Sequence, residues 1–410
     1  MFLGDRHGHL AYSTLVHPGD TWAEMRESLE TYAPAVKARV SPDETYGVSL
    51  RISGASAQTL TDDPAERRRL ASWLSEHDMY VFTVNAFPHG PFKGRRVMED
   101  VYEPDWATED RVRYTCQVAD ILAEITPSSV APSIQTAPLA FRAKVTCEAD
   151  VEVLTRNVLR VVAHLIEVER TTGRRVKLAL EPEPACYLET TEETIAYFRE
   201  RIWSASGARV LCDLTGLPVS EVVGLVRRHL GVVFDVCHQS VEFEDIAAAL
   251  RQLRDAGVPI FKLQAAAALR VPMVTADVVA ALGSFTDTIY LSQTTESRDG
   301  QLTRMLTLTE AIDRWKAQPG GVREWRTHFH VPVFLDDLGE FGTTRDGIER
   351  ALEVHADTPL SDHLEIETYT WDVLPAHLKS GDVTDYVSRE LEWFQEQLRS
   401  ATAALAASVE

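Results

Sequence analysis

The sequence predicts an α/β fold, and three observations point to a closed (β/α)8 TIM barrel. Short runs rich in β-branched and apolar residues alternate with longer amphipathic segments, which is typical of βαβ units around a parallel sheet. There are eight such runs, the number that closes a barrel of this kind. No glycine-rich fingerprint follows the first run, which disfavours the alternative, an open doubly wound sheet.

The eight expected strands cover residues 10–16, 47–52, 80–85, 130–135, 176–181, 231–236, 260–264 and 364–369. Helical patterns cover residues 64–76, 109–124, 149–171, 192–206, 243–256, 276–282 and 345–354. Pro64 directly after two aspartates is a helix-start signal. Two insertions are expected: residues 207–229 after strand 5, with an extra helix, and residues 287–337 between strands 7 and 8. We expect residues 1–386 to form one barrel domain and residues 387–410 a helix packed on its exterior.

Length and composition restrict the kind of protein. The chain of 410 residues can bury a large core, and its 45% hydrophobic and 25% charged residues are ordinary for a globular protein. A net charge of −21 disfavours nucleic acid and anionic membranes as partners. The five cysteines show no CxxC spacing, and neither a signal peptide nor a membrane-spanning run is apparent. We therefore expect free thiols, no membrane insertion and a cytoplasmic location.

Four of the predicted strands end in a side chain that can bind a metal. The run 231–234 leads into Asp235, and three other runs lead into Glu181, Gln264 and Glu367. The carboxyl ends of barrel strands meet at one rim, where active sites form. Each carboxylate alone would also fit an ion pair or a helix cap. Several buried carboxylates at one rim would repel each other without a cation, so the pattern favours a divalent metal ion.

The ligand types indicate which ions to expect. Carboxylate and amide oxygens suit Mn²⁺ or Mg²⁺, and nitrogen from nearby histidines would admit Zn²⁺ or Co²⁺. His238 follows Asp235 by three residues and is expected to contact substrate. Glu183 and Glu365 share the strand faces of Glu181 and Glu367, so either member of each pair could be the ligand.

Further residues near strand ends could contact a small polar substrate. These are His17, Asn85, His89, Arg270, His328, His330 and Trp371. His328 and His330 alternate in the run THFH, which puts both imidazoles on one face. The pattern leaves open whether this pair binds metal or substrate.

Six segments together resemble the EboE family of bacterial "metabolite traffic" proteins. They are YSTLVHPGDTW, VNAFPHGPF, LALEPEP, FDVCHQSVEFED, FKLQ and LEIETYTWDVLP, and they extend over nearly the whole chain. The motifs DVCHQ and ETYTWDVLP are quite specific. That family belongs to the xylose-isomerase-like barrels, which include sugar isomerases, epimerases, dehydratases and apurinic endonucleases.

The resemblance implies a role for each rim residue. Ligands to one metal would come from the fifth to eighth strands in order: Glu181, Asp235, Gln264 and Glu367. His238 in the Asp-x-x-His spacing and Arg270, six residues after Gln264, would contact substrate. Gln264 departs from the commoner histidine at its position. The HFH run and the following GEFG segment are faintly similar to the endonuclease loop that binds extra metals.

The leading functional hypothesis is a divalent-metal-dependent isomerase or epimerase, or a related lyase, acting on a sugar or cyclitol. Glu181 and Glu367 would exchange a proton next to a carbonyl through an enediolate. No nucleotide cofactor is expected; the partner is a small polyhydroxylated metabolite, and a homo-oligomer is compatible with the sequence. One alternative is a multinuclear hydrolase of a small phosphoester, with His17, His89, His328 and His330 recruiting further ions. The other is a non-catalytic metabolite carrier.

Overall fold

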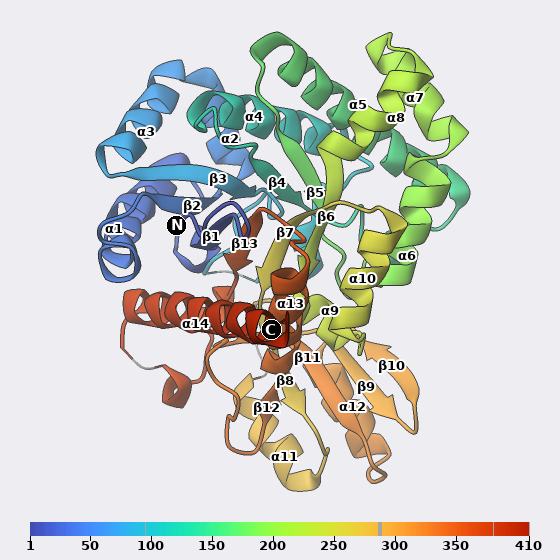
Figure 1. Ribbon diagram of the computed structural model, residues 1–410. Helices are drawn as coiled ribbons and strands as arrows, with labels where there is room; N and C mark the ends of the chain where they lie inside the picture. The colour runs from blue at the N-terminus through green and yellow to red at the C-terminus, as the bar shows by residue number, and fades with distance from the viewer. Residues whose placement is uncertain (95, 286–288, 380, 410) are drawn as a thin grey trace.

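Eight parallel strands form the barrel in the computed structural model, and they follow one another around it in chain order (Figure 1). They are β1 (His9–Tyr12), β2 (Tyr46–Arg51), β3 (Met79–Asn85), β4 (Ser133–Thr136), β5 (Lys177–Leu180), β6 (Leu230–Asp235), β7 (Ile260–Ala265) and β13 (His363–Ile366). An isolated parallel bridge between Ser13 and Ser49 joins the first strand to the second. The predicted (β/α)8 barrel is confirmed, and each predicted strand overlaps an observed one. The strands predicted at 10–16 and 364–369 are too long, because β1 ends before the 3₁₀ helix Thr14–Val16 and β13 ends at Ile366, and the strand predicted at 130–135 begins only at Ser133. The structure describes residues 1–94, 96–285, 289–379 and 381–409.

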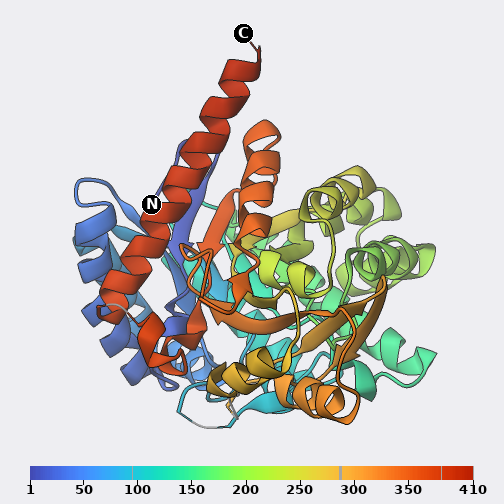
Figure 2. The same ribbon diagram turned by 90° about the horizontal axis from the view of Figure 1, so that it is seen from below.

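Helices surround the strands on the outside of the barrel (Figures 1 and 2). They are α1 (Trp22–Val40), α2 (Gly54–Asp62), α3 (Pro64–Glu76), α4 (Glu109–Ile125), α5 (Glu148–Thr172), α6 (Thr191–Tyr197), α7 (Ala205–Thr215), α8 (Val219–His229), α10 (Ile246–Ala256) and α13 (Arg345–Asp357). The short helix α9 (Val236–Val241), whose residues are all buried, directly follows β6 at the rim of the barrel. The sequence did not predict α1, although Thr21 and Glu24 form a capping box at its start. The expected extra helix after β5 is α8, preceded by α7.

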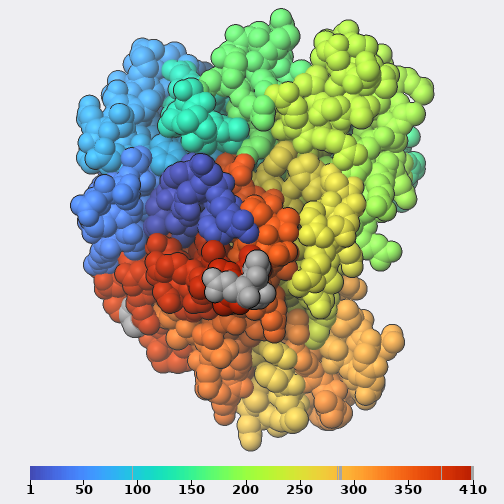
Figure 3. Space-filling model, viewed as in Figure 1, coloured from blue at the N-terminus to red at the C-terminus, as the bar shows by residue number. Residues whose placement is uncertain are grey.

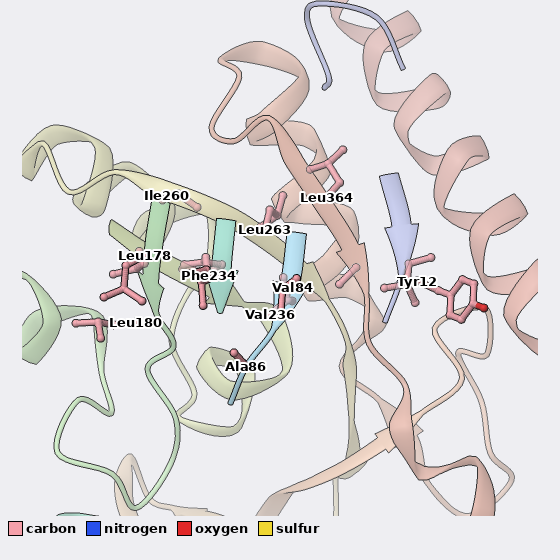
Figure 4. Close-up of a cluster of buried hydrophobic side chains, with 14 of the residues drawn as sticks. Tyr12, Val84, Ala86, Leu178, Leu180, Phe234, Val236, Ile260, Leu263 and Leu364 are labelled. Carbon is pink, nitrogen blue, oxygen red and sulfur yellow. The ribbon is translucent and has the colours of Figure 1, made fainter. Parts of the chain in front are cut away.

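The apolar core lies between the strands and the helices. Alternate strand residues such as Leu178, Phe234 and Leu364 are buried there (Figure 4). Gly231 lets β6 approach β7 closely, because a Cβ at this position would lie 2.4 Å from the carbonyl oxygen of Pro259.

The barrel interior is polar, which the sequence did not predict. Lys262 of β7 donates a hydrogen bond across the barrel to Gln135 of β4 at 2.6 Å, and it pairs with Glu365 of β13 at 3.0 Å. Both members of the Lys262–Glu365 pair are fully buried. These bonds hold the strand ends below the rim in fixed positions.

A second sheet of five strands covers one side of the barrel mouth (Figure 1). It consists of β8 (Ala267–Val271), β9 (Thr294–Arg298), β10 (Gln301–Met305), β11 (Glu324–Val331) and β12 (Gly342–Thr343), with α11 (Ala276–Ala281) and α12 (Leu308–Ala317) beside it. The expected insertion at 287–337 is therefore too short, because this unit begins at β8 directly after β7. The helix expected at 276–282 belongs to this unit, and α13 is the barrel helix before β13. Asp287, where the insertion was expected to begin, lies outside the described residues.

The last helix, α14 (Val383–Val409), packs against α1 and α13, and its C-terminal end projects beyond the body (Figure 2). The N-terminal segment lies beside it, and the hydroxyl of Thr402 is 3.4 Å from His7 Nε2 (Figure 3). Glu410, the end of the expected terminal helix, lies outside the described residues. Among the described helices, none combines the length and the apolar character that a membrane crossing requires.

Candidate metal centre

Three of the four predicted metal ligands converge at the rim of the barrel. Glu181 follows β5, Asp235 ends β6 and Glu367 follows β13. One carboxylate oxygen from each lies within 4.8 Å of the others, and all three side chains are buried. Parallel pairing brings β5, β6, β7 and β13 side by side, so residues distant in sequence meet at one edge.

The carboxyl groups in this cluster have raised pKa values. Burial raises the pKa of Glu181 well above its ordinary range, and the charges of Glu367 and Asp235 raise it further. Burial has the same effect on the pKa of Glu367, with Glu365 and Asp235 adding to it, and burial raises the pKa of Asp235. Three carboxylates this close and this buried stay ionised together only beside a cation.

Two oxygen atoms at this rim lack any hydrogen-bond partner among the described residues. Asp235 Oδ1 accepts the backbone N–H groups of Cys237 and His238 at 2.6 and 3.1 Å, which caps α9 and leaves Oδ2 without a partner. Gln264 donates from Nε2 to Glu365 at 3.1 Å, which leaves its Oε1 without one. An unpaired buried oxygen is costly, and a metal ion would satisfy both atoms. The residues present therefore fit a divalent cation.

Neighbouring polar groups hold these ligands in place. Gln135 donates to Glu181 Oε2 at 2.6 Å, and Asn85 donates to Glu367 Oε1 at 2.8 Å. Ser13 donates to the same Glu367 oxygen at 3.3 Å. The sequence left open whether Glu365 or Glu367 is the ligand. Glu365 pairs with Lys262 and accepts hydrogen bonds from Ser49 and Gln264 below the rim. This leaves Glu367 as the member of its pair that faces the cluster.

Three histidines meet next to the carboxylates. His328 Nε2 lies 3.2 Å from His330 Nε2 and 3.3 Å from His238 Nε2. His238 Nε2 is also 3.7 Å from Asp235 Oδ2. The first turn of α9 brings His238 to this place, and β11 brings the other two. A register shift in β11 between Thr327 and His330 accompanies this placement.

Hydrogen bonds define the tautomer of each ring. His238 Nδ1 lies 2.9 Å from the carbonyl oxygen of Pro182, and His330 Nδ1 lies 2.7 Å from that of Glu367, so both nitrogens donate. His328 Nδ1 donates to Gln293 Oε1 at 2.9 Å. The amide orientation of Gln293 follows from its Nε2, which donates to Glu183 and to the carbonyl oxygen of Pro184, both at 3.1 Å.

The three Nε2 atoms therefore face each other, and those of His328 and His330 carry lone pairs. Burial lowers the pKa of His328 well below its ordinary range and that of His330 to about 3, so these two rings are neutral. The lone pairs of His328 and His330 repel each other at this spacing, whereas a metal ion between the rings would be bound by both, with His238 beside it as a candidate third ligand. This arrangement fits a second cation, with Asp235 within reach of both places.

The sequence singled out neither Gln293 nor Tyr102 of this cluster. Gln293 orients His328, and Tyr102 donates to Glu183, the other carboxylate whose part the sequence left open, at 2.9 Å. Cys237, one of the expected free thiols, has its Sγ within 4.8 Å of the histidine nitrogens at 328 and 330. Gln293 lies in the inserted sheet, where the sequence offered no strand-end signal.

Four predicted substrate contacts lie away from this cluster. His17 stacks on Tyr32 with ring centroids 4.0 Å apart, and His89 packs edge-on against Tyr114. Arg270 lies on β8 and pairs with Glu324 at 2.8 Å, because the strand that carries it turns into the second sheet. Trp371 packs against Tyr386 of α14 at a centroid distance of 4.8 Å. None of these four lines the pocket described next, in the part of the chain that the structure describes.

A pocket opens above the carboxylates and histidines. Its polar floor consists of Asn85, Gln135, Glu181, Glu183, His238, His328 and Glu367. The remaining wall is apolar or aromatic: Leu15, Phe87, Pro88, Phe92, Val97, Met98, Val101, Tyr290, Leu291 and Tyr369. No lysine or arginine is among these lining residues, so far as the chain is described.

Fold and site together define a (β/α)8 barrel protein with a buried cluster of metal-ligating side chains at the carboxyl ends of its strands. No protein-family model and no curated protein matches the sequence. The resemblance to the EboE family is thus not confirmed.

Several solved structures are similar to this chain in fold. A D-tagatose 3-epimerase-like protein has 11% identity and a TM-score of 0.48, with 96% of this chain and 98% of that chain covered. A xylose isomerase-like TIM barrel protein from Mycobacterium smegmatis, in complex with magnesium, has 9% identity and a TM-score of 0.47, with 95% and 92% covered. The IOLI protein with a bound zinc atom has 12% identity and a TM-score of 0.45, with 97% and 98% covered. At these identities the likeness concerns the fold and assigns no activity.

Proposed function

We propose that the protein is a divalent-metal-dependent isomerase or epimerase that moves a proton next to the carbonyl of a small, uncharged substrate. The observation that carries this proposal is the pairing of Glu181 and Glu367 at the floor of one pocket. Both carboxyl groups have raised pKa values, and both would hold the ion with Asp235 and Gln264. A bound ion would lower these pKa values again, so both carboxylates would be ionised and able to accept a proton from the substrate.

The pocket chemistry favours a neutral carbonyl compound over a phosphoester. Phosphate sites usually contain arginine or lysine, and the described lining residues include neither. A bound divalent ion would polarise a carbonyl oxygen and stabilise negative charge that develops on it. Glu181 and Glu367, held by Gln135 and Asn85, would remove and return the proton. His238 would orient a substrate oxygen from the side of α9.

The test is proton exchange. Protein loaded with Mn²⁺ or Mg²⁺ is incubated in D₂O with small hydroxy ketones, and deuterium uptake at the carbon next to the carbonyl is followed by mass spectrometry. We expect uptake with the natural sequence and with the exposed control Glu221→Gln, and a loss of at least 100-fold in Glu181→Gln and Glu367→Gln. Metal content is measured on each sample, so that loss of the ion is distinguished from loss of the proton acceptor. Equal uptake in all four proteins would refute the proposal.

A second candidate function is hydrolysis by a two-ion centre, and the histidine cluster is the observation that favours it. Two ions bridged by a carboxylate are typical of enzymes that activate water against an ester. Asp235 is the residue that could contact both, since it belongs to the carboxylate group and also lies within 4.8 Å of His238 and His330. Two bound ions per chain, with release of phosphate from small phosphoesters and no deuterium uptake, would favour this function.

The other alternative, a non-catalytic metabolite carrier, predicts binding without reaction. It requires that small hydroxy ketones raise the melting temperature of the metal-loaded protein, while deuterium uptake and ester hydrolysis both stay at the level of the free metal. These three measurements on one preparation therefore separate the three functions.

A further inference from the structure

The wall of the pocket differs in chemistry from its floor. Every charged or amide group that lines the pocket belongs to the floor, beside the candidate ions. The rest of the lining comes from the segment after β1, the loop after β3, the 3₁₀ helix Met98–Tyr102, the segment that precedes β9 and the 3₁₀ helix Tyr369–Asp372 after β13. Five separate parts of the chain thus supply the apolar surface.

This wall is well packed rather than loosely exposed. Phe92, Tyr290 and Tyr369 contact each other, with ring centroids 4.9 to 5.3 Å apart. Together with Leu15 and Val97 they form one buried apolar cluster. Phe87 and Leu291 belong to a second cluster beside it. A packed wall keeps its shape when ligand binds, so its chemistry selects the ligand.

A hydroxyl group placed against this wall would lose its hydrogen bonds to water and find few partners. Such a buried unpaired group costs about 1–3 kcal/mol, which is sufficient to reject a polyhydroxylated tail. A methyl group at the same place would gain free energy from burial. The expectation from the sequence, a metabolite that carries hydroxyls throughout, therefore fits the floor but does not fit the wall.

The two cationic side chains nearest to the wall, Lys93 and Arg51, do not make it polar. Lys93 Nζ lies near the rings of Phe92, Tyr290 and Tyr369, but it is bound to the Tyr369 carbonyl oxygen and pairs with Asp372 at 3.1 Å. Arg51 lies over Phe92 and pairs with Asp20 at 3.1 Å. Both cations lie behind the rings, and neither is among the lining residues.

We propose that the substrate is amphipathic, with an oxygen-rich end that chelates the ion and a short aliphatic end that contacts the wall. This inference rests on the metal centre of the proposed function and adds the substrate class. The cavity measures about 60 Å³. This is smaller than the roughly 150 Å³ that holds a benzene ring in an engineered protein core. The apolar end is therefore a few carbons long.

Hydroxamates test this inference by binding alone, since their common head chelates the metal and their tails vary. The full chain loaded with Zn²⁺ is titrated calorimetrically with acetohydroxamate, propionohydroxamate and 3-methylbutanohydroxamate. We expect the affinity to rise about fourfold for each added methylene. The matched probe 3-hydroxybutanohydroxamate replaces one methyl by a hydroxyl, and we expect it to bind at least tenfold more weakly than 3-methylbutanohydroxamate.

Two isosteric variants show whether the wall causes the preference for the methyl tail over the hydroxylated tail. Val101→Thr adds a hydroxyl to the wall and should reduce the tenfold preference to threefold or less. Val153→Thr, on the exposed face of α5, should leave it unchanged. A flat series, or tighter binding of the hydroxylated tail, would overturn the inference. If deuterium is taken up but the hydroxamate affinities do not depend on the tail, the proposed function is supported and this inference is wrong. If the affinities depend on the tail but no deuterium is taken up, this inference is supported and the proposed function is wrong.

Discussion

His328 and His330 present their Nε2 atoms to each other at 3.2 Å, although each ring donates its Nδ1 proton elsewhere. Neither nitrogen has a proton to offer the other. His238 Nε2 lies 3.3 Å from His328 Nε2, so the three rings surround one place where a cation would bind. Removing one of these ligands should therefore change metal content.

For the two-ion candidate function, we expect His330→Ala to lower the bound Zn²⁺ from two ions per chain to one, with the carboxylate-bound ion retained. Dialysis against metal-free buffer followed by elemental analysis measures this stoichiometry. The control is His164→Ala, since His164 pairs with Asp120 on the outside of the barrel at 2.8 Å. Equal metal content in the two variants would contradict a second ion at the histidines.

Gln264→Met should weaken the ion held by the carboxylates. The variant keeps the volume of the side chain and removes both the unpaired Oε1 and the Nε2 that donates to Glu365. Loss of the Nε2 bond lowers stability with and without metal, so only the metal-induced part of the stability reports on Oε1. Ten times weaker binding lowers the metal-induced stabilisation by about 1.4 kcal/mol. The shift in melting temperature on adding Mn²⁺ measures it, with Gln252→Met on the exposed face of α10 as control. An unchanged shift would remove Gln264 from the ligand set.

Lys262→Met should destabilise the fold, because Glu365 would be left buried without its partner. Breaking a buried pair in this way costs about 3–5 kcal/mol. Urea denaturation followed by fluorescence measures the free energy of unfolding. In the double variant Lys262→Met, Glu365→Gln the unpaired charge is gone, and we expect most of the loss to be recovered. A double variant no more stable than the single one would show that packing dominates.

Glu390 should make stability fall as pH rises. Burial raises the pKa of this carboxyl from 4.5 to about 8, and it accepts hydrogen bonds from Thr368 and from the backbone of Val333. Below pH 4.5 both the folded and the unfolded chain are protonated. Between pH 4.5 and 8 only the unfolded chain loses the proton, which costs up to about 1.4 kcal/mol per pH unit.

Glu390→Gln removes this titration and keeps the accepting oxygen. The difference in unfolding free energy between pH 5 and pH 7.5 should therefore shrink in the variant. Glu392→Gln, at an exposed position of the same helix, is the control. A wild-type protein and variant with parallel pH profiles would show that Glu390 is ionised in the folded chain.

The sequence by itself determined the barrel and three of the residues that meet at its rim. Short apolar runs between amphipathic segments predict parallel strands, and parallel strands bring their carboxyl ends to one edge. Glu181, Asp235 and Glu367 each lie at the carboxyl end of a predicted strand, so their proximity follows from the local sequence pattern. The strand-face rule also placed His328 beside His330.

Only the tertiary structure decided what those residues contact. Arg270 follows Gln264 by six residues, yet β8 turns away from the rim and carries it into the second sheet. His238 and His328 are 90 positions apart and meet because that sheet folds over the barrel mouth. The polar interior around Lys262 and the apolar wall around Phe92 likewise combine separate segments. Long-range packing brings such groups together, and the local spacing of residues in the sequence contains no information about these contacts.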